Sequence, residues 1–191
     1  MVRQELSKSN IGTRRLILRP LRESDAAAIF ALFNDWDVVR WLSSPPWPYA
    51  RDDAEAFVRS VLNPADDTAE IAFAITLHDG LIGTIGLRQR PASRLQGGAG
   101  LNVGYWLGKQ HWGHGYMTEA LRALVNHVFA LSGADAIYSG AFADNRASLR
   151  VQEKAGFVHA GETALFSRPT GRELAHVNTV LTRASLEFLA A

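Results

Sequence analysis

Apolar residues recur along the chain with two periods, two residues and about 3.6 residues, which are typical of strands and helices respectively. The clearest strand pattern places Ile71, Phe73 and Ile75 on one side, with small or polar residues between them. The turn His78-Asp79-Gly80 then leads into a second apolar run, so these two strands are predicted to form a hairpin. The strands that such patterns predict are residues 13–21, 71–77, 81–88, 101–107, 136–142, 157–163 and 174–181.

Helical spacing of apolar residues alternates with these strands. The predicted helices are residues 24–33, capped by Ser24, residues 52–62 and 116–131, and a shorter helix that Asn145 caps and Gly156 ends. Because helices interrupt a largely antiparallel series of strands, the sequence predicts a mixed α/β (α+β) fold. No internal repeat or linker divides it.

Composition excludes several classes of function. The 191 residues suit one domain, which we expect over residues 13–191 after a flexible segment, residues 1–12. A net charge of +1 gives no basic surface for nucleic acid, and the chain has no cysteine for thiolate chemistry. No apolar run suits a signal peptide or a membrane span. We therefore expect a cytoplasmic protein without nucleic-acid or membrane partners, and a mobile connection at residues 91–100.

Residues 101–131 carry the strongest signal for a binding site. A predicted strand is followed by a turn with Gly113 and Gly115, and then by a helix from Tyr116 whose first turn has no capping side chain. Backbone N–H groups at such a helix start have no internal acceptor, so together with the helix dipole they can bind phosphate. A purely structural turn is the alternative. The glycine spacing fits neither a P-loop nor the dinucleotide-binding pattern.

Histidines give a weaker signal. His111 and His114 lie three residues apart, but no further ligands accompany them, so no metal site is predicted. His78 and His176 are isolated and remain only as remote candidates for a general base, since histidine titrates near neutral pH.

A loop rich in proline and aromatic residues follows the first helix. Trp41, Trp47 and Tyr49 lie in or beside it. Two interpretations are about equally well supported, because burial of an aromatic side chain is favourable in free energy wherever it lies. They either form one wall of a substrate site or cover an edge of the core.

Two motifs give the chain a resemblance to a known family. They are Gln110-x-x-Gly113-x-Gly115 followed by Tyr116-Met117-Thr118-Glu119-Ala120, and Asn145-x-x-Ser148 followed by Glu153-Lys154-Ala155-Gly156-Phe157. Together they resemble the GNAT superfamily of acetyl-CoA-dependent N-acetyltransferases, and most closely its RimJ/RimL type, the ribosomal-protein N-terminal acetyltransferases. The resemblance covers residues 13–181 and implies a twisted, mostly antiparallel sheet of about seven strands, flanked by about four helices and splayed at its central strands.

The resemblance also implies roles for individual residues. The loop from His111 to Met117 would hold the CoA diphosphate by its amides, and Tyr105–Leu107 would pair with the pantetheine arm as a strand does. Gly104 would lie where the sheet splays, and one free amide would stabilise the oxyanion. The cofactor-binding residues implied in this way are Tyr105, Trp106, Leu107, Gln110, His111, Trp112, Gly113, His114, Gly115, Tyr116, Met117, Asn145 and Ser148.

Two positions differ from the wider family. Where many relatives have a tyrosine that protonates the departing thiolate, this chain has Gln152, and Ser148 one helical turn earlier would donate to the sulfur instead. Where many relatives have a glutamate as general base, this chain has Asn102, which can position water but cannot accept a proton. At pH 7, deprotonating a lysine side chain costs about 4–5 kcal/mol, whereas an α-amine costs only about 1 kcal/mol. A site without a strong base therefore favours an α-amine.

The leading hypothesis is an enzyme that transfers acetyl from acetyl-CoA, its co-substrate, to a primary amine by direct attack in a ternary complex. The N-terminal α-amine of a protein or peptide is the favoured acceptor, and a small-molecule amine such as an antibiotic or polyamine is the alternative. Ser148 and Asn102 are the candidate catalytic residues. A catalytically weak module that senses acyl-CoA is the hypothesis from another class. The sequence leaves monomer or homodimer open.

Overall fold

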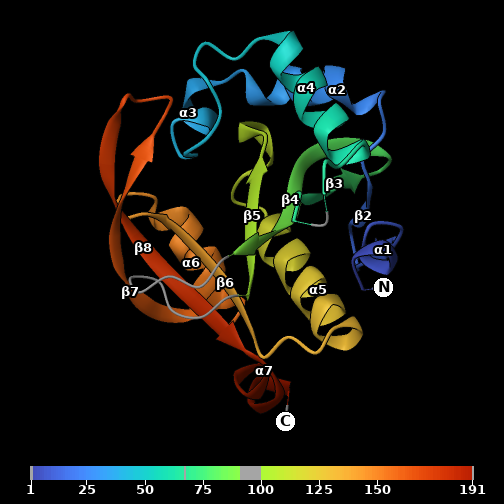
Figure 1. Cartoon of the computed structure of the whole chain (residues 1–191), viewed down its shortest axis with the longest axis vertical. Coiled ribbons are helices and arrows are strands. Elements are labelled where there is room, and N and C mark those ends of the chain that lie inside the picture. Colours follow the sequence, from blue (N-terminus) through green and yellow to red (C-terminus); the bar gives the residue numbers. More distant parts are fainter. Residues whose placement is uncertain (1, 67, 91–99, 191) are drawn as a thin grey trace.

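The computed structural model describes residues 2–66, 68–90 and 100–190 (Figure 1). Its strands are β1 (Ile11–Gly12), β2 (Ile17–Pro20), β3 (Ile71–Leu77), β4 (Gly80–Arg90), β5 (Gly100–Leu107), β6 (Ala136–Phe142), β7 (Val158–Ser167) and β8 (Arg172–Thr182). Its helices are α1 (Val2–Leu6), α2 (Asp25–Phe33), α3 (Trp36–Val39), α4 (Arg51–Leu62), α5 (Tyr116–Leu131), α6 (Arg146–Lys154) and α7 (Arg183–Ala190), with a 3-10 turn at Lys109–His111.

The strands form one sheet in the order β1-β2-β3-β4-β5-β6-β8-β7. Neighbouring strands are antiparallel except β5 and β6, which are parallel. The chain between these two forms α5, the kind of crossover that parallel neighbours require. Figure 1 shows β5 and β6 diverging, so that the sheet opens into two halves.

Helices cover both faces of the sheet. On the face called here the α5 face, α5 and α1 pack on the strands and form the larger core, and α6 packs against α5 and β6. On the other, called here the α4 face, α2, α3 and α4 form a second core over β3 and its neighbours. Figure 1 shows α2 and α4 together at one end of the molecule.

The alternation of side chains along β5 assigns its residues to these two faces. Val103 is buried in the larger core and Tyr105 packs against it, so both point to the α5 face. Trp106 packs against the second core, which places Asn102 and Gly104 on the α4 face with it. One strand thus presents different side chains to each side of the sheet.

The predicted fold class is confirmed, because the sheet is mixed, mostly antiparallel and opened at its central strands. The apolar spacing gave the bounds of α5 correctly, and Asn145 caps α6 as predicted by accepting a hydrogen bond from the N–H of Ser148 (3.1 Å). The predicted hairpin is present and consists of β3 and β4. The described residues form eight strands rather than about seven, and their short helices α1, α3 and α7 add to the four that were expected.

The flexible segment predicted at residues 1–12 contains regular structure instead. Its described part forms α1 and β1, and β1 pairs with β2. Leu6 and Ile11 are buried in the larger core. Two apolar residues in a polar stretch are too few to show a period, so the pattern gave no sign of this packing.

The predicted cap of the first helix is also wrong. Ser24 makes no capping hydrogen bond. Asp25, which is 5% exposed, accepts a hydrogen bond from the N–H of Arg22 (2.8 Å) and forms an ion pair with Arg19 (2.8 Å). The ion pair with Arg19 of β2 therefore stabilises the start of this helix.

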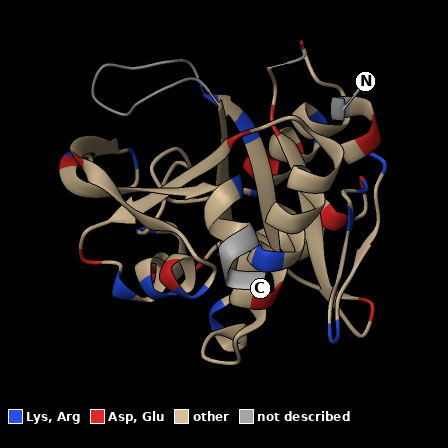
Figure 2. Ribbon diagram, turned by 90° about the horizontal axis from the view of Figure 1, so that it is seen from below, with Lys and Arg blue, Asp and Glu red and all other residues tan. Residues whose placement is uncertain are grey.

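Three further predictions concern the connection at residues 91–100, membrane spans and surface charge. The connection predicted to be mobile lies outside the described residues, apart from Gly100 at the start of β5. Within the described ranges, no helix is both long enough and apolar enough to cross a membrane. Figure 2 shows positive and negative residues interspersed over the described elements, in keeping with the small net charge.

Candidate active site

A cleft opens where β5 and β6 separate. The two strands pair over only two residues each, the last pair being Asn102 with Tyr138. Just beyond, the hydroxyl of Ser139 donates to the carbonyl oxygen of Val103 (3.0 Å). The diverging strands leave a cavity of about 670 Å³, lined by residues from α3, β5, α5, β6, α6 and β8. A cavity of this volume is large enough for an extended small-molecule ligand.

The turn before α5 lies against this cavity. Gly113 and Gly115 have φ angles of 79° and 77°, a region that glycine adopts without strain. Gly115 is the N-cap of α5 and supplies no side chain, so the first N–H groups of the helix have no side-chain acceptor. A Cβ atom on Gly113 would meet nothing within 4 Å. The turn therefore leaves room for an anionic ligand at the helix start.

Basic side chains from α6 line the same cavity. Arg150 and Lys154 lie one helical turn apart and both belong to its lining. Together with the uncapped start of α5, they supply positive charge from two elements to one cleft. This set of donors fits a ligand that carries a diphosphate on an extended arm.

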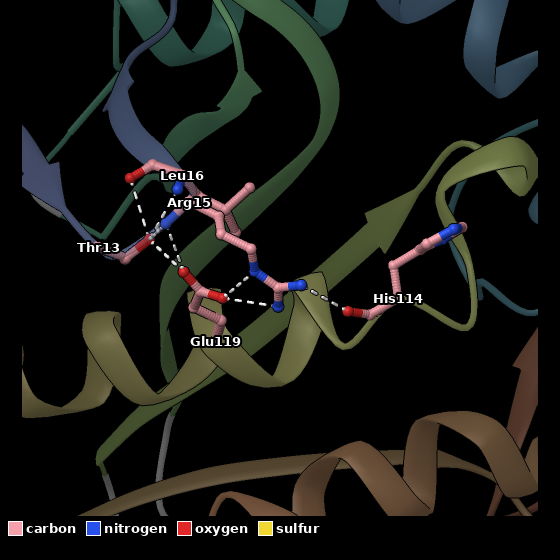
Figure 3. A network of polar contacts seen from close by, with 5 residues as sticks. All are labelled: Thr13, Arg15, Leu16, His114 and Glu119. Atoms are coloured by element: carbon pink, nitrogen blue, oxygen red, sulfur yellow. Dashed lines mark hydrogen bonds and ion pairs between the residues drawn. The ribbon is translucent and has the colours of Figure 1, made fainter.

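A polar network holds the start of α5 against the N-terminal strands (Figure 3). Glu119 accepts hydrogen bonds from the hydroxyl of Thr13 (2.7 Å) and from the N–H and Nε of Arg15 (2.9 and 2.7 Å). Arg15 also donates through Nη1 to the carbonyl oxygen of His114 (3.0 Å). Burial alone would raise the pKa of Glu119, but these hydrogen bonds outweigh it and hold the pKa below its ordinary value. The network thus fixes the turn to the body of the protein.

A second network joins α6 to the central strands. Gln152 is completely buried, and its Oε1 accepts a hydrogen bond from the hydroxyl of Thr179 (2.7 Å). Its Nε2 therefore faces the other way, toward the carbonyl oxygen of Gly140 (3.1 Å), the hydroxyl of Tyr105 (3.2 Å) and the hydroxyl of Ser148 (3.3 Å). The amide orientation follows from the carbonyl oxygen of Gly140, which can only accept a hydrogen bond and so requires the amide nitrogen on its side.

The proton on Ser148 is left available by this arrangement. The hydroxyls of Ser148 and Tyr105 lie 3.0 Å apart, and the Tyr105 hydroxyl also lies 3.3 Å from the carbonyl oxygen of Ser148. Burial raises the pKa of Tyr105, so its hydroxyl keeps its proton and can donate it to either Ser148 oxygen. When Tyr105 is the donor in this pair, Ser148 can donate its own proton into the cleft.

A smaller cavity of about 390 Å³ lies on the α4 face, lined by residues from α2, α4 and β4. Its lining shares Asn102, Gly104 and Trp106 with the larger cavity. Arg88 and Glu70 also line it, and they form an ion pair (2.7 Å). Residues of β5 at the opening of the sheet therefore border a cavity on each face.

Comparison with known proteins identifies this architecture. Residues 15–158 match the family described as "Acetyltransferase (GNAT) domain". The chain belongs to the GNAT acetyltransferase family. It is similar to the uncharacterised N-acetyltransferase YoaA of Bacillus subtilis (strain 168), with 30% identity over 153 residues that cover 79% of this chain and 84% of YoaA. The protein is therefore an acetyl-CoA-dependent acyltransferase.

Solved structures show the same fold. Mycobacterium smegmatis RimJ in complex with CoA-disulfide has a TM-score of 0.79 and 21% identity, over 94% of this chain and 90% of that one. RimL, the ribosomal L7/L12 alpha-N-protein acetyltransferase in complex with coenzyme A, has a TM-score of 0.75 and 19% identity, over 91% of this chain and 98% of that one. Identities this low establish a shared GNAT fold.

Most of the residues predicted to bind the cofactor meet at the larger cavity of the GNAT domain. Those in its lining are Tyr105, Trp106, Leu107, His111, Trp112, Gly113, Gly115, Tyr116, Met117, Asn145 and Ser148. Gln110 and His114 do not belong to it. The His114 ring stacks on Tyr116 (5.4 Å between centroids), and its carbonyl oxygen binds Arg15, so His114 supports the turn from outside the cavity. Contact of the lining residues with CoA stays a prediction.

The three aromatic residues predicted to form a substrate wall are separated. Trp41 lines the larger cavity. Tyr49 lines the smaller one but is only 7% exposed, packs on Phe33 (4.6 Å between ring centroids), and burial raises its pKa to about 12. Trp47 is 39% exposed, lies against Trp36 (5.3 Å), and belongs to the lining of neither described cavity.

The charged residues of the cavities were not singled out from the sequence; they are Asp53, Glu70, Arg88, Arg90, Arg150 and Lys154. Arg150 and Lys154 are spaced four apart on a predicted helix, which was an available signal for one basic face. For Arg88 and Glu70, the sequence contains no comparable signal. Arg88 faces the cleft because it pairs with Asn102 across β4 and β5, and this register is not visible in the sequence.

Proposed function

We propose that this protein acetylates the N-terminal α-amine of a peptide or protein. The observation that carries the proposal is Asn102, which borders both cavities where the sheet opens and has no proton-accepting carboxylate. Two carboxylates line the smaller cavity: Glu70 is paired with Arg88, and Asp53 accepts a hydrogen bond from the N–H of Ala50 (2.8 Å). Without a strong free base, a lysine acceptor at pH 7 costs about 4–5 kcal/mol to deprotonate and an α-amine about 1 kcal/mol. The site therefore favours the weaker amine.

Acetyl-CoA would occupy the larger cavity from the α5 face. The turn at Gly113–Gly115 and the start of α5 would bind its diphosphate, with Arg150 and Lys154 close by. The pantetheine arm would lie along Tyr105–Leu107, residues of β5 beyond its last pairing with β6. A Cβ atom on Gly104 would meet nothing within 4 Å, which leaves space for the acetyl end of the ligand.

The acceptor would approach from the α4 face and attack the thioester directly in a ternary complex. Its nitrogen bonds to the carbonyl carbon, and the carbon–sulfur bond breaks with its electron pair moving to sulfur. The hydroxyl of Ser148 would donate a hydrogen bond to the departing thiolate, since the network of Tyr105 and Gln152 leaves its proton free. Amides of β5 would stabilise the oxyanion.

Two solved relatives bear on the choice of acceptor. RimL is an alpha-N-protein acetyltransferase, so this fold accommodates a protein N-terminus, which supports the proposal. The microcin C7 self immunity acetyltransferase MccE, in complex with acetyl-CoA and AMP, has a TM-score of 0.75 and 16% identity, over 93% of this chain and 99% of that one. It makes a small-molecule amine the alternative.

The test is an acceptor screen with purified protein and acetyl-CoA, in which release of the CoA thiol is followed. The panel holds peptides that vary in the first residue, polyamines and aminoglycoside-type amines. We expect turnover with a subset of the peptides. Turnover with small amines alone would replace the acceptor class proposed here, and CoA binding without turnover of any amine would favour a sensor.

A further inference from the structure

His176 lies at the mouth of the opened sheet, on the α4 face. It is on β8 opposite Phe142 of β6, and both line the larger cavity. Thr179, three residues further along β8, contacts α6 on the α5 face. Because strand residues alternate, His176 points to the other side, as Asn102 does on β5. It therefore faces the direction from which the acceptor would approach.

Gly140 provides the space for the imidazole. A Cβ atom at this position would lie 2.3 Å from Cε1 of His176, so the ring lies directly over the glycine. The carbonyl oxygen of the same glycine accepts a hydrogen bond from Gln152, which also donates to Ser148. His176 thus lies over Gly140 on the α4 face, and Gln152 links the carbonyl oxygen of that glycine to Ser148 on the α5 face. An acid and a base placed in this way would serve the two ends of one displacement.

The imidazole is suited to accept a proton. Burial lowers the pKa of His176 more than a hydrogen bond to Asn178 raises it, so the ring is neutral at neutral pH. Nδ1 is fully buried, which leaves Nε2 as the ring nitrogen to take a proton from the cleft. The charged side chains lining this side of the cavity are Arg88 and Arg90 of β4, the first paired with Glu70. Positive neighbours favour the neutral ring over the imidazolium.

We propose that His176 is the catalytic residue that accepts the proton of the acceptor amine, an inference that rests on the proposed function. As the nitrogen–carbon bond forms, the nitrogen loses one proton to His176, which returns it to water. The sulfur leaves as a thiolate, hydrogen-bonded to Ser148, and takes up one proton from water. The products are the acetylated amine and CoA thiol, so protons balance. A base this weak suits an α-amine better than a lysine.

The test compares His176→Gln and His176→Asn with the wild type at saturating acetyl-CoA and an accepted peptide. We expect kcat to fall about 10²-fold or more, while the Kd for CoA, which would bind from the other face, changes less than about threefold. The wild-type kcat should fall as the pH drops through the lowered pKa of His176, and both variants should lose this dependence. His159→Gln is the matched control, since His159 is exposed on β7 and outside the cavity.

Other outcomes would overturn the assignment. A kcat within about threefold of the wild type in either variant that binds CoA normally would do so, as would a wild-type profile with no acidic limb; the second measurement holds even if both variants fold poorly. Loss of activity in Glu70→Gln, with His176→Gln active, would assign the proton to Glu70. Failure of the proposed function looks different, because the wild type would then acetylate no peptide at any pH.

Discussion

The hydroxyl of Ser148 lies in a network of polar neighbours. Gly140 and Thr179 orient the Gln152 amide, and Gln152 and Tyr105 lie within hydrogen-bond distance of the Ser148 oxygen. Buried polar groups that are satisfied in this way hold one geometry, because any other leaves a group unpaired. The network would therefore hold the Ser148 hydroxyl in place for the proton donation proposed for it.

Removal of this hydroxyl should affect the chemical step and not cofactor binding. We expect Ser148→Ala to lower kcat about 10²-fold, because a positioned proton donor typically contributes 10²- to 10⁴-fold. The Kd for CoA, measured by calorimetry, should stay within about threefold. Ser60→Ala, an exposed site on α4, is the control. An unchanged kcat in Ser148→Ala would remove the role proposed for this residue.

At the scale of single residues, the side-chain partners of the candidate site could not be predicted from the sequence. From the sequence, Gln152 only replaces the proton-donating tyrosine that many relatives have. The structure shows that its side chain is buried and lies within hydrogen-bond distance of four partners. His176 was one remote base candidate among isolated histidines. Its place beside Gly140 depends on the pairing of β6 with β8, for which no local pattern exists.

Among the elements, the turn into α5 was the most predictable. Gly113 and Gly115 before an uncapped amphipathic helix predict a left-handed turn, and both glycines have positive φ angles. The anion site at this turn stays a proposal. Burial of Leu6 and Ile11, in contrast, depends on packing against distant elements. Local sequence specified the turn because its geometry is a property of the residues themselves.

Substitution at this turn tests the cofactor site. Gly113→Glu would place a carboxylate and added bulk in the space where the diphosphate is proposed to bind, and we expect the Kd for CoA to rise at least about tenfold. Gly113→Ala is the matched control, because it introduces the same backbone strain at φ 79° without the charge. Equal CoA affinity in Gly113→Glu and the wild type would contradict the site.

The network of Glu119 should make the stability of this region depend on pH. The folded-state pKa of Glu119 lies below its ordinary value, so its contribution is present above the unfolded pKa and is lost as pH falls through the folded pKa. Glu119→Gln should therefore lower the urea midpoint at pH 7 more than in acid, and should weaken CoA binding. Exposed Glu23→Gln is the control. A midpoint difference that grows in acid would contradict the assignment.

For the whole molecule, function follows from a sheet that is open at its middle. The parallel pair β5 and β6 separates after two residues, so one cleft borders both faces, with the proposed donor site on the α5 face and the proposed acceptor side on the α4 face. The sequence indicated this opening only through resemblance to a family, since strand divergence is set by register and by packing of α5 and α6. The acceptor side, built by α2, α4 and charged residues of distant strands, had no signature of its own.

The most direct measurement uses one accepted peptide that carries both a free N-terminal α-amine and an internal lysine. The peptide is incubated with the protein and acetyl-CoA at neutral pH, and fragmentation mass spectrometry locates the acetyl group. We expect it on the α-amine, with the lysine unmodified, and no modification by His176→Gln under the same conditions. Acetylation of the lysine alone would contradict the central claim.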